Sequence, residues 1–213
     1  MDPLLIDFPE QFETDRLLIR CPMPGDGRFL AEAIKESFHT LHRWMNWADH
    51  IPSAEESEEL ARRARVKFLA REDLLFFVLH KDTGAFLGSI GLHRMDWKLR
   101  KFEIGYWIRD SASGNGYMTE AVQGLTQFAG NVLHANRIEI RCDVRNTASR
   151  RGAERCGYYL EAVLLKNFVD PEGQIRDDCV YAKVRPEDGR LGYPGTNWCT
   201  GANELPFAHR DVQ

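Results

Sequence analysis

Hydrophobic and polar positions repeat with two different periods along this chain, and the changes of period divide it into helices and strands. Apolar residues three and four positions apart predict helices over 26–38, 53–73 and 119–132. Runs that are apolar throughout, or apolar at every second position, predict the strands 17–19, 74–80, 85–93, 102–108, 138–144, 158–168 and 174–184. A further short helix is expected after residue 146.

Turn and capping residues support these boundaries. Ser53 and Glu56 form a capping box that opens the second helix. Residues 81–84 and 170–173 have the composition of turns, and the second joins the last two strands as a hairpin. The resulting order, βααβββαβαββ, predicts an α/β (α+β) fold. We expect a mixed, twisted and mostly antiparallel sheet with helices on both faces.

The segment Ser111-Ala112-Ser113-Gly114-Asn115-Gly116-Tyr117-Met118 connects a predicted strand to a predicted helix. Glycines allow the backbone to pass close to a ligand, and the N–H groups at a helix start attract anions. This arrangement favours a phosphate or pyrophosphate site. The segment lacks the residues of a P-loop and the spacing of the dinucleotide fingerprint, so a tight connection with no ligand is the alternative.

A second segment resembles the other half of a coenzyme site. The strand 137–144 is followed by Asn146-Thr147-Ala148-Ser149 and then by a helix that ends at Cys156-Gly157-Tyr158. With the glycine loop before it, this order resembles the acetyl-CoA-binding core of the GNAT superfamily of N-acetyltransferases. The segments 14–20, 103–107 and 114–121 resemble its Rim-type (RimL-like) branch, which acts on protein N-termini. The resemblance extends from about Thr14 to Lys183.

The resemblance implies acetyl-CoA as co-substrate and assigns residues to it. Backbone groups of the strand that precedes the loop would pair with the pantetheine arm, loop amides would hold the pyrophosphate, and an asparagine would lie beside the arm. These residues are Tyr106, Trp107, Ile108, Ser113, Gly114, Asn115, Gly116, Tyr117, Met118, Thr119 and Asn146. Without a ligand, Asn146 would act only as a helix N-cap.

The resemblance also suggests catalytic residues. Glu103 matches a frequent general base, whereas a purely structural Glu103 would face solvent and pair with Lys101 or Arg141. Ser149 matches a serine near the thioester sulfur, and would otherwise be a solvent-facing residue of the first helical turn.

Trp44 and Trp47 lie between the first two predicted helices, in a region that shapes the acceptor pocket of relatives. Hydrophobic packing is the alternative for either one. Two positions depart from the family pattern. Ser111 replaces a Gln or Arg at the start of the loop, although its backbone amide can still serve. Ala153 replaces a Tyr that protonates the leaving thiolate in many relatives, so any proton donor must be another group.

Composition and charge limit the kinds of partner that this protein is expected to bind. The net charge of −4 provides no basic footprint for nucleic acid, and no apolar run reaches membrane-spanning length. Five cysteines without paired spacing indicate neither a disulfide framework nor a zinc site, the histidines have no metal-ligand spacing, and a reducing cytoplasm fits best. We expect one domain over 1–185 and an irregular tail over 186–213, whose aromatic residues would pack on the core or on a partner subunit of a homodimer.

The predicted activity is direct transfer of acetyl from acetyl-CoA to a primary amine without a metal. Kinship to the Rim-type branch implies the α-amine of a protein N-terminus, of ribosomal type. Small-molecule amines, either polyamines or aminoglycosides, are the alternative acceptors. Two different functions also fit the sequence: a CoA-binding sensor without turnover, and a phosphate-binding protein unrelated to CoA. The sequence names neither the acceptor nor the oligomeric state.

Overall fold

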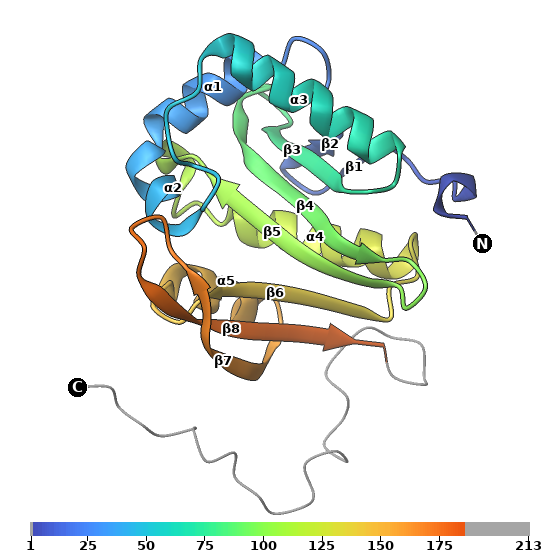
Figure 1. Cartoon of the computed structure of the whole chain (residues 1–213). Helices are drawn as coiled ribbons and strands as arrows, with labels where there is room; N and C mark the ends of the chain where they lie inside the picture. Colours follow the sequence, from blue (N-terminus) through green and yellow to red (C-terminus); the bar gives the residue numbers. More distant parts are fainter. Residues whose placement is uncertain (1, 186–213) are drawn as a thin grey trace, which may run out of the picture.

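Eight strands form one mixed sheet in the computed structural model, which describes residues 2–185 (Figure 1). The strands are β1 (Gln11–Glu13), β2 (Leu17–Arg20), β3 (Leu74–His80), β4 (Phe86–Asp96), β5 (Lys101–Ile108), β6 (Arg137–Asp143), β7 (Tyr159–Val169) and β8 (Ile175–Val184). The helices are η1 (Pro3–Leu5), α1 (Gly27–Glu36), α2 (Phe38–Trp44), α3 (Ala54–Leu69), η2 (Asp110–Ala112), α4 (Tyr117–Asn131) and α5 (Thr147–Arg155). The predicted tail, residues 186–213, lies outside the described residues.

The strand order is β1-β2-β3-β4-β5-β6-β8-β7. Within the described residues β5 and β6 are the one parallel pair, and the other neighbouring strands are antiparallel. The crossover that joins β5 to β6 contains the glycine loop and α4, because parallel strands need a long connection. The predicted fold class and the predicted antiparallel meander of β3, β4 and β5 are therefore confirmed.

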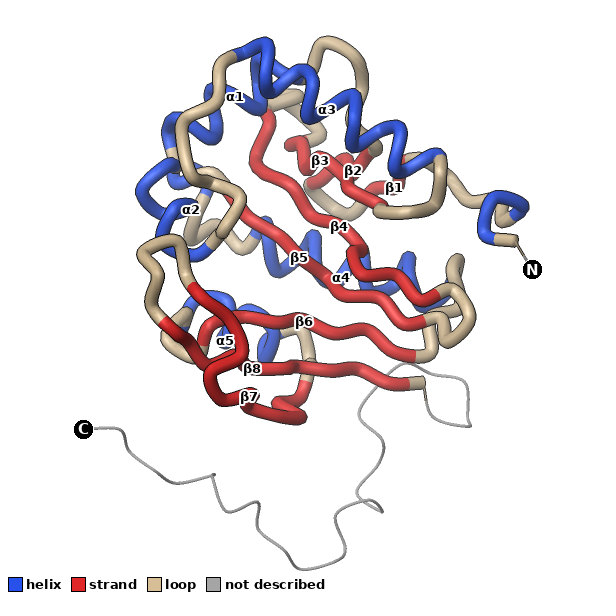
Figure 2. The backbone as a smooth tube through the Cα atoms, viewed as in Figure 1, coloured by secondary structure: helices blue, strands red, loops and turns tan. Residues whose placement is uncertain are grey.

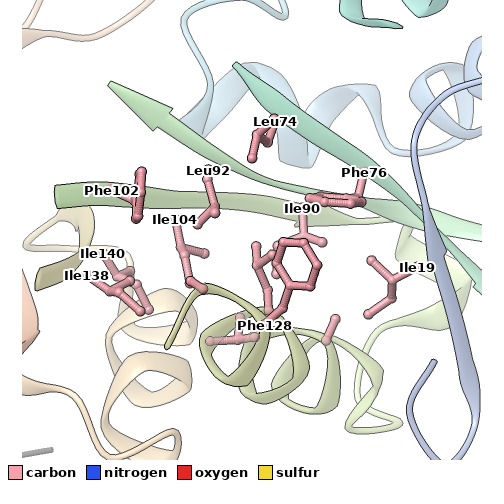
Figure 3. Packing of buried hydrophobic residues seen from close by; sticks show 14 of the residues in the cluster. Ile19, Leu74, Phe76, Ile90, Leu92, Phe102, Ile104, Phe128, Ile138 and Ile140 are labelled. Atoms are coloured by element: carbon pink, nitrogen blue, oxygen red, sulfur yellow. The ribbon is translucent and has the colours of Figure 1, made fainter. Parts of the chain in front are cut away.

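Helices cover both faces of the sheet (Figure 2). Each face has its own hydrophobic core. On one face α4 packs Phe128 against Phe76, with the ring centroids 5.7 Å apart. Figure 3 shows Phe128 of α4 below the sheet residues Ile90 and Ile104. On the other face α1 and α3 bury Ile34 against the strands. The second core covers part of its face. Glu103 of β5, Glu139 of β6 and Asp178 of β8 lie outside this core, and Glu139 and Asp178 are buried.

The helix predicted over 26–38 is confirmed as α1, which ends two residues earlier than predicted, but the short helix that follows it was not predicted. The chain turns at Ser37, with φ −103° and ψ 13°, so α1 ends at Glu36 and a separate helix, α2, follows. Trp44 is consequently the last residue of α2 and does not lie between two helices. The apolar spacing continues through the break, which is why the sequence pattern does not reveal it.

Other boundaries differ less. The sequence pattern does not predict β1, because three residues are too few to show alternation. α4 starts at Tyr117, two residues earlier than predicted, so Tyr117 and Met118 belong to its first turn. Cys21, Cys142, Cys156 and Cys179 are free thiols, and Cys199 lies outside the described residues. Among residues 2–185, no helix is both long and apolar enough to traverse a lipid bilayer.

Candidate active site

The segment between β5 and α4 is fastened to α1 by one carboxylate. Oε1 of Glu36 accepts a hydrogen bond from the backbone N–H of Ser111 at 2.8 Å, and Oε2 accepts one from Nε of Arg109 at 2.9 Å. The hydrogen bond from Arg109 is the main reason that the pKa of Glu36 falls to about 2. The Ser111 amide is therefore committed to Glu36, which corrects the expectation that it serves the coenzyme.

The next six backbone N–H groups after Ser113 are free to meet a ligand. Gly114 and Gly116 have φ values of 80° and 78°, a region that residues with a Cβ enter at a cost. Gly116 is the N-cap of α4 and offers no capping side chain. Among residues 2–185, no group accepts a hydrogen bond from the N–H groups of residues 114–119. These donors and the α4 dipole suit a pyrophosphate, so the loop fits CoA.

Arg16 adds a cation beside this loop that the sequence reasoning did not assign to the site. Its Nη1 donates to the carbonyl of Asn115 at 3.1 Å, and its guanidinium lies 4.5 Å from the ring centroid of Tyr117. Its Nε also pairs with Glu120 at 2.7 Å, which fixes the side chain and offsets part of its charge. No spacing signal marks Arg16, because it comes from the other end of the chain.

Strands β5 and β6 part at the level of the loop. Their parallel pairing begins with Lys101 beside Arg137 and ends with Ile104 beside Ile140. Beyond this point residues 105–108 of β5 pair with β4, and residues 141–143 of β6 pair with β8. The two strands therefore leave facing edges without a strand partner. An extended ligand with amide groups can insert there as an added strand does.

Three predicted site residues meet at this opening. Asn146 caps α5, since its Oδ1 accepts from the N–H of Ser149 at 3.1 Å. Oγ of Ser149 lies 3.0 Å from the hydroxyl of Tyr106, on β5. Burial raises the pKa of Tyr106 to about 12, so this hydroxyl keeps its proton at neutral pH.

The Tyr106 hydroxyl is a functional group that sequence reasoning missed. The prediction used only the backbone of Tyr106. Its oxygen would lie 3.3 Å from a Cβ added at Gly152, next to the position where Ala153 replaces the family tyrosine. The hydroxyl thus reaches the α5 segment from β5, and sequence spacing within the α5 segment cannot reveal it.

Glu103 lies on the opposite side of β5 from Phe102 and Ile104. Its Oε2 is 3.1 Å from Nη1 of Arg94 and 3.4 Å from Nε of Arg141. The predicted pairing of Glu103 with Arg141 is thus present, and Arg94 is an additional partner. Its carboxylate can act through a water molecule, but it is not a free group.

Asp178 is a second carboxyl on this side that the sequence did not single out. It is buried on β8, directly across from Asp143 of β6. Burial raises its pKa, Arg141 lowers it and Glu103 raises it, so these three groups interact. A carboxyl with a raised pKa is a better-matched proton acceptor at neutral pH than an ordinary one.

The two predicted acceptor residues are not equivalent. The Trp47 ring lies 6.2 Å from the ring of Trp107, which is on β5, and Trp47 is 49% exposed. The ring of Trp44 instead makes a cation–π contact with Arg43, whose guanidinium lies 4.7 Å from the ring centroid. Trp47 therefore packs on the strand that borders the opening, whereas Trp44 stacks with its own neighbour in α2. Within the part of the chain described, no three potential metal ligands cluster.

A strand pair that opens beside an uncapped helix N-terminus suits a CoA-dependent acyltransferase, and comparison with known proteins identifies the class. The family model described as "Acetyltransferase (GNAT) domain" matches residues 16–159. The chain belongs to this family. It is an acetyl-CoA-dependent N-acetyltransferase, with acetyl-CoA as co-substrate.

Relatives of known sequence extend along most of the chain. The Bacillus subtilis protein named "Putative ribosomal N-acetyltransferase YdaF" is 33% identical over 178 residues, which are 82% of this chain and 94% of that protein. The Escherichia coli ribosomal-protein-serine acetyltransferase is 28% identical over 124 residues, 58% of this chain and 68% of its own length.

Solved structures share the fold. The microcin C7 self-immunity acetyltransferase MccE, in complex with acetyl-CoA and AMP, aligns with a TM-score of 0.77 and 24% identity over 83% of this chain and 97% of its own. The ribosomal L7/L12 acetyltransferase RimL, in complex with coenzyme A, aligns with a TM-score of 0.77 and 20% identity over 82% and 98%. These similarities support the architecture and not the acceptor.

Proposed function

We propose that this N-acetyltransferase acetylates the α-amine at the N-terminus of a protein of ribosomal type. The main support for a transfer site here is that β5 and β6 separate after Ile104 and Ile140. Beside this opening lie six backbone N–H groups that have no hydrogen-bond acceptor among residues 2–185. The acceptor class is supported by the names of two relatives, one a ribosomal N-acetyltransferase and one a ribosomal-protein-serine acetyltransferase.

The residues that hold the co-substrate would act through their backbone. The N–H groups of 114–119 hold the pyrophosphate, and Arg16 adds a positive charge beside them. The free edge formed by Tyr106, Trp107 and Ile108 pairs with the pantetheine amides, and Asn146 lies beside the same arm. A backbone N–H on this edge can donate to the thioester oxygen as negative charge develops there.

The amine would approach from the side of the sheet that carries Glu103 and Trp47. The nitrogen attacks the thioester carbon, and the amine proton passes through water to a carboxyl beside Arg141. Glu103 is the predicted acceptor, and Asp178 is the neighbouring carboxyl whose pKa is raised. Arg141 lies 3.4 Å from Glu103, pairs with Glu139 at 2.9 Å and lowers the pKa of Asp178, so the two candidate carboxyls interact with one guanidinium.

The carbon–sulfur bond then breaks and the sulfur leaves as a thiolate. Oγ of Ser149 would donate a hydrogen bond to it, and the Tyr106 hydroxyl would donate to Ser149 in turn. Since a thiolate is a fair leaving group near neutral pH, this chain of hydroxyls has only to stabilise it. It supplies the role that Ala153 cannot fill.

Two peptides with one reactive amine each test the acceptor. The first has a free N-terminal amine and no lysine, and the second has a blocked N-terminus and one lysine. We expect acetyl transfer from acetyl-CoA to the first only, followed by mass spectrometry. Acetylation of the lysine peptide alone would contradict the proposal, as would turnover with polyamines or aminoglycosides and with neither peptide. Glu103→Gln should lower the rate while the affinity for CoA stays unchanged.

A further inference from the structure

A polar cavity of about 440 Å³ lies between α2, the residue Arg145 that follows β6, and the turn that joins β7 to β8. Figure 1 shows this turn close to α2. Nδ2 of Asn46, just after α2, donates to the carbonyl of Val169 at 3.1 Å and links the two walls. The cavity is separate from the glycine loop and lies across the sheet from α4.

The cavity is at the open end of the strand pair. Oγ1 of Thr40, in α2, bonds to Asp110 at 3.1 Å, and the N–H of Asp110 donates to Oγ of Ser37 at 2.9 Å. These bonds attach α2 to the carboxyl end of β5. Arg145 is two residues beyond the end of β6. The cavity therefore spans the ends of the two strands that part, where an acceptor amine would enter.

Three arginines line this cavity, Arg43, Arg145 and Arg176, and they differ in whether a carboxylate already pairs with them. Arg43 is exposed, stacks on Trp44, and pairs with no carboxylate among residues 2–185. Arg176 has a side chain that is 11% exposed; it pairs with Asp170, and its Nη1 lies 3.5 Å from Oδ2 of Asp143, so its charge is already compensated. Arg43 is therefore the guanidinium of this lining that can bind an anionic group of a ligand by charge-assisted hydrogen bonds.

The acidic groups nearby differ in how far they are already satisfied. Asp170 accepts from the N–H groups of Glu172 and Gln174 and pairs with Arg176. Asp143 accepts from the N–H of Arg145 at 2.7 Å and pairs with its guanidinium. The carboxylate of Glu172 is exposed and has no partner among the described residues. Glu172 is thus the one lining acid whose charge would oppose an incoming anion.

The geometry points to this cavity as a subsite for a carboxylate carried by the acceptor. The preferred acceptors would be primary amines with a carboxylate a few bonds from the reactive nitrogen. That carboxylate can be an acidic side chain near the N-terminus of a peptide or the α-carboxylate of a free amino acid. Arg43 would bind it, as guanidinium groups bind carboxylates. The inference rests on the proposed function, because it describes the acceptor of the same transfer.

Matched acceptors test the subsite. Tetrapeptide amides that begin with Ser-Asp and Ser-Asn differ by one charge, and free serine and serinamide differ by the α-carboxylate. We expect kcat/KM to be about tenfold higher for the acid of at least one pair, and the pair that responds identifies the source of the carboxylate. Arg43→Gln should reduce this preference to about twofold or less. Glu172→Gln should increase it, because it removes the opposing charge.

Arg28→Gln is the control, since Arg28 stacks on Phe29 as Arg43 stacks on Trp44 but lies on α1 outside the cavity. It should leave the preference unchanged. Equal kcat/KM within both pairs, in the wild type and in Arg43→Gln, would overturn the subsite while the transferase stands. If CoA binds and no amine is acetylated, the proposed function fails. Titration of the same four compounds into the CoA-bound protein then decides: tighter binding of an acid that Arg43→Gln abolishes supports the subsite, and equal affinities overturn it.

Discussion

The carboxylate of Glu36 is predicted to stabilise the fold and to hold the glycine loop, residues 111–118, in position. Its pKa falls from 4.5 to about 2, chiefly through the hydrogen bond from Arg109. At about 1.4 kcal/mol per pH unit this corresponds to roughly 3 kcal/mol. Because the side chain is 29% exposed, solvent screening reduces the expected loss in Glu36→Gln to about 1–2 kcal/mol at pH 7. The same change should weaken CoA binding, since Ser111 loses a charged acceptor.

Urea unfolding of the wild type and Glu36→Gln between pH 7 and pH 3.5 measures this contribution. A lowered pKa stabilises the folded state above the pKa of the unfolded chain, and this stabilisation is lost as the pH falls towards the folded value. The difference between the two proteins should therefore be constant down to about pH 5 and shrink below it. Glu59→Gln, in an exposed pair with Arg63, should cost less than about 0.5 kcal/mol. A difference that does not change with pH would refute the reasoning.

Three further changes separate the parts of the site. Gly116→Ala should cost about 1–2 kcal/mol of stability and weaken CoA binding in a titration, whereas Gly84→Ala, also at positive φ, should cost stability alone. Tyr106→Phe should lower kcat about 3–10-fold without changing KM for acetyl-CoA, and its effect should not add to that of Ser149→Ala. Asp178→Asn should shift the acidic limb of the pH–rate profile, and an unchanged limb would exclude Asp178 as the proton acceptor.

Local sequence signals were sufficient for the described strands other than β1 and for the glycine loop. The long apolar run of β3 has its predicted bounds, and the capping box at Ser53 starts α3. Each of these depends on residues that are neighbours in the sequence. The glycines of the loop were also identifiable, because left-handed backbone at Gly114 and Gly116 leaves a direct trace in the residue type.

Groups that depend on distant parts of the chain were not predictable in this way. Glu36 reaches the glycine loop from α1, and Arg16 reaches it from the turn before β2. The Tyr106 hydroxyl approaches Ser149 from a different element. The raised pKa of Asp178 arises only in the folded sheet, where Asp178 is buried on β8 and interacts with Arg141. Tertiary packing brings these groups together, and no single period or motif in the sequence encodes their distances.

Release of free thiol from acetyl-CoA is the measurement that tests the central claim most directly. The purified full chain is incubated with acetyl-CoA and with N-terminal peptides, polyamines or aminoglycosides in parallel. The account predicts thiol release that depends on a peptide with a free N-terminal amine and is absent with the polyamines and the aminoglycosides. Release with a polyamine or an aminoglycoside alone would contradict the proposed acceptor. No release with any amine, together with no binding of CoA, would contradict the site itself.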